Sequence, residues 1–237
     1  MPEPSPHTAR QRLWWLVGAA AATVVLWQVP GGNYVLYPFT ILATWFHEMA
    51  HGLAALMLGG SFTKLMVYSD GSGAACYWGP LALGNLGQAL VAGAGPMGPP
   101  IAGAILIMSS RSEKATRVSL WLLGGLLLTS TALWVRSLFG AVAIPLMGLA
   151  VMAVPLRGSA GIQACAVQFL GVQACVGMFL RLDYLFTPSA GPLGISDTAQ
   201  IQQVLFLPFW FWGACITALS LAIPVMSLRI AYRGDIP

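Results

Sequence analysis

Charged residues are scarce in this chain of 237 residues. Only 8% of its residues are Asp, Glu, Lys or Arg, whereas 57% are hydrophobic. A soluble domain usually has about 25% charged residues, because its surface faces water. The shortage excludes an ordinary soluble domain and predicts that most of the surface faces lipid.

Cysteine is also scarce, and its spacing limits the sites that the chain can build. The four cysteines (Cys76, Cys165, Cys175 and Cys215) include no CxxC pair. We therefore predict neither a disulfide framework nor a thiolate metal site. The net charge of +4 falls in short segments between apolar runs. In a membrane protein this pattern concerns orientation and lipid contact, so no nucleic-acid partner is expected.

What the sequence has in abundance is long apolar runs. Since a membrane span needs about 20 residues, we predict an all-α polytopic membrane protein with six or seven transmembrane helices. The first run has no small-residue cleavage site at its end, so it is expected to stay as a span. We expect a polar N-terminal tail at 1–12, a single transmembrane domain at 13–230 and a C-terminal tail at 231–237. The runs lie at about 13–29, 36–58, 87–108, 118–134, 138–155, 162–180 and 204–228.

The segment 61–78, "SFTKLMVYSDGSGAACYW", differs from all the runs. It is too polar and too short to span, and "SDGSG" is a turn signal between two β-prone stretches. We predict a small β-hairpin at the membrane or dipping into it. Tyr68, Ser69 and Asp70 lie at its tip and are candidates for substrate binding, since an edge strand can pair with an extended peptide. The alternative is a purely structural turn.

The orientation of the chain is left open by its charges. Arg10 and Arg12 favour a cytoplasmic N-terminus. With seven spans, however, this choice puts the most charged loop, "RSEKATR" at 111–117, on the outside. Either the number of spans differs by one or the positive-inside tendency is broken here.

The sequence "FHEMAH" places three ionisable residues inside an apolar run. His47 and His51 are four residues apart, so on a helix they share a face at about 5–6 Å. Two imidazoles at that spacing can bind one zinc ion, and Glu48 on the adjacent face can act as a general base on a zinc-activated water. A polar contact between helices is the structural alternative. Ionisable residues inside a span are costly, which favours a functional site.

A catalytic zinc needs a third protein ligand. The remaining histidine, His7, lies in the tail, and the chain has only seven acidic residues. Asp197 opens an apolar run after Gly- and Pro-rich sequence, so it is the preferred third ligand. Its alternative role is the cap of a helix. Asp183 is the second choice of ligand.

The stretch "FHEMAHGLAALMLGGSFTKLMVYSDGSG", followed by "AGAGPMGPP", resembles the peptidase M50B-like branch of the site-2 protease superfamily, the intramembrane zinc metallopeptidases. The resemblance continues through "LWVRSLFG" and "SDTAQIQQVLFLPFWFWG". It implies that His47, His51 and Asp197 bind Zn²⁺ and that Glu48 is the general base. It also implies a membrane-embedded protein substrate whose peptide bonds are hydrolysed in or beside the bilayer.

Two departures from the family pattern favour an alternative function. Gly95-Pro96 is not followed by the family's Asn, and no Leu-Asp-Gly occurs. The alternative is a non-catalytic member of the same fold that binds metal or a partner in the membrane. A transporter would spread its polar residues over several spans, whereas here they concentrate at one site. The composition fits an integral protein of a prokaryotic inner membrane.

Overall fold

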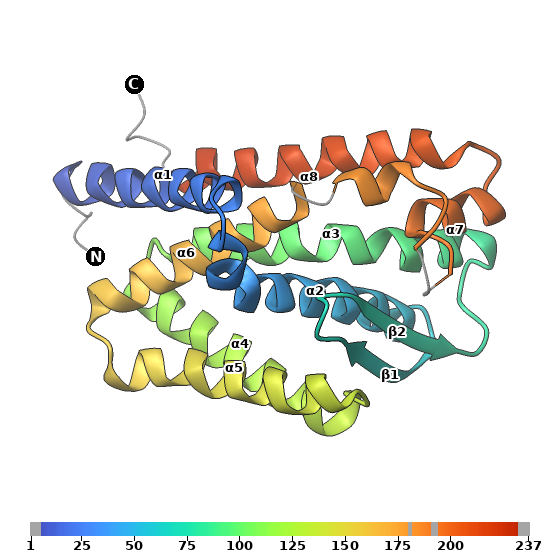
Figure 1. Ribbon diagram of the computed structural model, residues 1–237, viewed down its shortest axis with the longest axis horizontal. Helices are drawn as coiled ribbons and strands as arrows, with labels where there is room; N and C mark the ends of the chain where they lie inside the picture. Colours follow the sequence, from blue (N-terminus) through green and yellow to red (C-terminus); the bar gives the residue numbers. More distant parts are fainter. Residues whose placement is uncertain (1–5, 180–181, 191–193, 232–237) are drawn as a thin grey trace.

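The computed structural model describes residues 6–179, 182–190 and 194–231, and these form a largely helical fold with one small sheet (Figure 1). Five helices are long and apolar enough to cross a membrane: α3, α4, α5, α6 and α8. The all-α membrane architecture is therefore confirmed, but the count of six or seven spans is not. The elements are α1 (Pro6–Gln28), α2 (Gly32–Met57), β1 (Ser61–Val67), β2 (Gly73–Trp78), α3 (Asn85–Ser109), α4 (Glu113–Leu133), α5 (Leu138–Arg157), α6 (Ala160–Phe179), the 3₁₀ helix η1 (Leu182–Phe186), α7 (Asp197–Val204) and α8 (Phe209–Ala231).

Two apolar runs differ from the helices that they predicted. α1 begins at Pro6, so it extends into the segment predicted as a polar tail. The run at 204–228 spans a break: α7 ends at Val204 and α8 begins at Phe209. The residues between them are as apolar as the helices, which is why hydropathy did not reveal the break.

The predicted β-hairpin is present, and it lies alongside α2. β1 and β2 pair in antiparallel fashion, and the turn points back toward the beginning of α2 (Figure 1). The Tyr37 hydroxyl donates to the Ser69 carbonyl at 2.7 Å, and the Thr44 hydroxyl donates to the Gly71 carbonyl at 2.7 Å. These bonds fix the turn against the helix that carries the histidines.

The outer edge of β1 is covered by the linker between α4 and α5. Leu65 donates its N–H to the Trp134 carbonyl at 2.8 Å, and its own carbonyl accepts the N–H of Arg136 at 3.0 Å. The Ser137 hydroxyl bonds to both main-chain groups of Val67, at 3.0 and 2.8 Å. β1 is therefore paired on both sides, and only β2 has an open edge.

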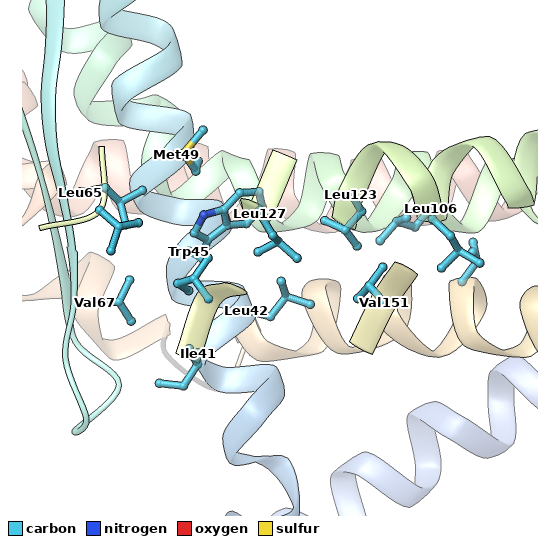
Figure 2. Close-up of a cluster of buried hydrophobic side chains, with 14 of the residues drawn as sticks. Ile41, Leu42, Trp45, Met49, Leu65, Val67, Leu106, Leu123, Leu127 and Val151 are labelled. Carbon is cyan, nitrogen blue, oxygen red and sulfur yellow. The ribbon is translucent and has the colours of Figure 1, made fainter. Parts of the chain in front are cut away.

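The hydrophobic core lies between α2, the hairpin, α4 and α5. Trp45 is at its centre, and its indole N–H donates to the Ser130 hydroxyl at 2.9 Å, so the buried polar atom is satisfied (Figure 2). Leu65 and Val67 of β1 face the same cluster as Leu127 of α4. This packing fixes α2 through the helix face opposite to the one that carries His47 and His51.

Glycines allow α3 to approach its neighbours closely. A Cβ at Gly103 would collide with the Gly171 backbone of α6, and one at Gly98 would collide with the Phe46 carbonyl of α2. Small residues of this kind are the usual means of close helix contact in a membrane. α3 thus lies against the part of α2 that carries His47 and His51.

Candidate metal centre

His47 and His51 meet a carboxylate from the far end of the chain. Both histidines lie on α2, and their ring centroids are 4.8 Å apart. Asp197, the first residue of α7, places Oδ2 3.0 Å from Nε2 of His47 and Oδ1 3.3 Å from Nε2 of His51. Asp183, the second choice from sequence, is exposed and lies outside this group.

Asp197 is free to face the histidines because its neighbour caps α7. The hydroxyl of Ser196 accepts the Ala199 N–H at 3.3 Å, which is the N-cap bond. Burial raises the pKa of Asp197, but the adjacent His51 and His47 together lower it by more than burial raises it. The net pKa therefore lies below its usual value. The carboxylate is therefore ionised at neutral pH, as a metal ligand must be.

The three side chains fit a metal ion. Their ligand atoms all lie within 4.8 Å of one another. Oδ2 of Asp197 is buried and makes no hydrogen bond, although it lies 3.0 Å from Nε2 of His47. A buried carboxylate oxygen without a donor is costly. A cation between the carboxylate and the two imidazoles would satisfy it, so this group could hold a metal ion.

α3 orients one of the histidines and makes room for both. Nδ1 of His51 lies 2.7 Å from the Val91 carbonyl, which as an acceptor places the proton on Nδ1 and leaves the Nε2 lone pair for a metal. A Cβ at Gly95 would overlap the imidazoles of His51 and His47. Only glycine fits at that position.

Glu48 lies beside the metal-ligating group and under the hairpin. Its side chain is only 7% exposed. It is packed against Gly73, where a Cβ would stand 2.9 Å from Oε1, and the Ala75 N–H donates a hydrogen bond to its carboxylate. The base candidate of the sequence is therefore held by the main chain of β2.

A cavity of about 640 Å³ opens beside these residues. It is bounded by α2, the hairpin, η1 and the segment that follows η1. Burial raises the pKa of Tyr184, as does the negative charge of Asp197, and the ring centroid of Tyr184 lies 6.3 Å from that of His47. Tyr184 is thus a neutral hydroxyl group beside the site. The lining includes Thr44, His47, Glu48, His51, Gly71, Ser72, Gly73, Ala74, Ala75, Tyr77, Asp183, Tyr184 and Asp197.

The three hairpin residues named from sequence do not line this cavity. Tyr68 and Ser69 lie just before the lining segment, and Asp70 accepts the N–H and hydroxyl of Ser72 at 2.9 and 2.6 Å, which is ordinary turn chemistry. The hairpin reaches the cavity through the residues that follow, from Gly71 onward.

The family comparison agrees with this geometry. The Peptidase M50B-like model matches residues 15–227, which is most of the chain. The chain belongs to the Peptidase M50B-like family. This confirms the resemblance noted from the sequence. The chain has no significant match among curated proteins or solved structures. Membership and the five apolar helices together indicate an integral membrane protein related to peptidases.

In this M50B-like chain, sequence reasoning missed several residues of the site. Tyr184 had no signal, because a lone tyrosine after a span reads as an interfacial residue. Gly73 and Gly95 were visible only as parts of a turn and a glycine-rich helix. Their contacts with Glu48 and the histidines depend on tertiary packing.

Proposed function

We propose that this protein is a zinc-dependent intramembrane metalloprotease that hydrolyses peptide bonds of membrane-embedded proteins. The observation that carries the proposal is the meeting of His47, His51 and Asp197 beside Glu48 at a cavity. Two imidazoles and one carboxylate form the donor set of known catalytic zinc sites. Family membership supports a peptidase.

His47, His51 and Asp197 would hold the ion, and Glu48 would move the proton. When bound, zinc makes a water acidic enough to attack at neutral pH and polarises the scissile carbonyl. Glu48 takes the proton of the attacking water and then gives it to the leaving amine. Its burial against β2 excludes bulk water from the carboxylate, and the Ala75 N–H orients it.

The open edge of β2 would hold the substrate in an extended form. Because both main-chain groups of Leu65 bond to the α4–α5 linker, Leu65 and Ala75 form a non-hydrogen-bonded pair within the hairpin. The main-chain groups of Ala75 therefore point away from β1, to the side where the cavity lies; its N–H is donated to Glu48, and its carbonyl would be the acceptor for a substrate strand. An unwound peptide that pairs with this edge would run past Glu48.

Metal content of the protein purified in detergent tests the proposal first. We expect about one zinc per chain in the wild type, from the one ligand group found among the described residues, and none in His47→Ala or His51→Ala. The loaded protein should cleave a transmembrane model substrate, and a chelator should stop the cleavage. A wild type without stoichiometric metal would contradict the proposal.

The non-catalytic alternative predicts a different outcome. A protein that only holds a metal or a partner has no need of a buried carboxylate beside the ligands, so Glu48 favours catalysis. The non-catalytic hypothesis is favoured if the protein binds zinc but cleaves no substrate, and if substitution of Glu48 changes neither zinc binding nor stability.

A further inference from the structure

Most of the positive charges among the described residues lie at one end of the helix bundle. The α3–α4 and α5–α6 connections, the start of α1 and the end of α8 lie at the same end (Figure 1). Among the described residues, that end has a single acid, Glu113. Its described cations are Arg111, Lys114, Arg117, Arg157 and Arg229.

The opposite end is nearly balanced. It carries the hairpin, the α4–α5 linker and the connection from α6 to α7 (Figure 1). Outside the metal centre, the cations described there are Lys64 and Arg136, and the acids are Asp70 and Asp183. The excess of positive charge therefore lies at one end of the bundle and is not spread evenly over both ends.

The first two helices together make one crossing of the bundle. α1 and α2 run in the same direction, away from the basic end, and only the short linker Val29–Gly31 joins them (Figure 1). Two consecutive helices with the same direction cannot each span the bilayer.

We propose that the basic end lies against the anionic headgroups of the cytoplasmic leaflet and that the cavity is entered from the opposite side. With α1 and α2 as one crossing and five further spans, the chain crosses six times. All basic connections then share one side, as the positive-inside tendency requires. The conflict over the loop at 111–117 disappears, because it arose from counting seven spans.

The cavity follows from this orientation. Its lining includes hairpin residues, residues between 183 and 190, and Ile195, and all of these lie at the end opposite the basic one. This consequence rests on the proposed protease function: a substrate would be cleaved in the part of its transmembrane segment that lies nearer the non-cytoplasmic side. The orientation itself does not depend on catalysis.

Labelling of single cysteines with a membrane-impermeant maleimide tests the orientation. In a chain whose four native cysteines are replaced by alanine, Ser112→Cys and Ser159→Cys probe the basic end, and Asn85→Cys and Gln203→Cys probe the other end. All four positions are exposed. We expect Asn85→Cys and Gln203→Cys to react in bacterial spheroplasts, and Ser112→Cys and Ser159→Cys to react only in inverted vesicles. The reverse pattern, or reaction of both ends on one side, would overturn the proposal.

Two fusions and two charge variants keep the test decisive. If the cysteine-free chain does not fold, fusions to the wild-type chain replace the labelling. Green fluorescent protein at the C-terminus should then fluoresce, and alkaline phosphatase at the C-terminus should be inactive.

Neutralising Arg111, Lys114 and Arg117 to Gln should give mixed labelling of both ends. The matched control, Lys64→Gln with Arg136→Gln, should leave the pattern unchanged. A C-terminal phosphatase that is active would place the basic end outside, whatever the catalytic assays give.

Discussion

Nδ1 of His51 on α2 lies 2.7 Å from the carbonyl oxygen of Val91 on α3. The acceptor belongs to a backbone, so no side-chain substitution removes it, and the imidazole is set by the packing of the two helices. One turn further along α3, Gly95 faces both histidines. The metal centre therefore depends on how closely α3 approaches α2.

Gly95→Ala should abolish metal binding. The added methyl group would overlap both imidazoles, so either the ligands or α3 must move. Gly93→Ala is the matched control, since its Cβ would meet only Ile201 Cδ1 at 3.8 Å, an ordinary contact. Zinc content measured by mass spectrometry should be lost in the first variant and kept in the second. Full metal in Gly95→Ala would show that the two helices are less close than described.

Glu48→Gln should keep the metal and lose catalysis. The amide has nearly the same shape but cannot accept the proton of the attacking water, so the cleavage rate should fall by at least about 100-fold. The measurement is single-turnover cleavage of a transmembrane substrate beside metal content. A variant that cleaves at the wild-type rate would remove Glu48 from the mechanism.

Asp197→Asn and Asp183→Asn separate the two candidate third ligands. The first removes the negative charge between the histidines, and its zinc content should fall well below one per chain. The second changes an exposed side chain of the cavity that lies outside the ligand group, and its zinc content should stay at the wild-type value. The opposite pattern would make Asp183 the ligand.

Ser137→Ala should loosen the hairpin without touching the metal ligands. The substitution removes both hydrogen bonds to Val67 and leaves buried main-chain groups unpaired, at a cost of about 1–3 kcal/mol. Hydrogen exchange at the Val67 amide should accelerate, and cleavage should slow while zinc content is unchanged. Unchanged exchange would mean that the linker does not secure β1. Ser69→Ala, in the turn, serves as the control.

The sequence was most informative about the metal site, because residues that can bind a metal are few in this chain. Three histidines and seven acids in a membrane chain left few possible ligand sets, so elimination led to Asp197. The hairpin was predictable because its polarity stands out between apolar runs. The role of Ser196 as the cap of α7 could not be chosen from sequence, since serine and aspartate cap equally well.

The number of membrane crossings and the contacts of Gly73 could not be predicted, because hydropathy does not show in which direction a helix runs or what packs against it. An apolar run says that a helix can lie in lipid, but not whether it turns back or continues. α1 and α2 read as two spans although they run the same way (Figure 1). Gly73 is similar: a glycine in a turn is expected for its backbone, and its contact with Glu48 appears only when β2 is laid on α2.

The separation of the ligands along the chain has a mechanical consequence. His47 lies in the second helix and Asp197 in the seventh, so an ion bound by both would act as a cross-link that closes a loop of about 150 residues. Because the unfolded chain does not hold the site together, the binding free energy of the ion would add to the stability of the folded chain. Without the ion, α7 is a two-turn helix held by packing and by a few hydrogen bonds, such as that of the Thr198 hydroxyl to the Leu185 carbonyl at 3.0 Å. Local opening of the metal-free protein should therefore begin where α7 joins α8, and a protease added from that side should find its first cutting site there.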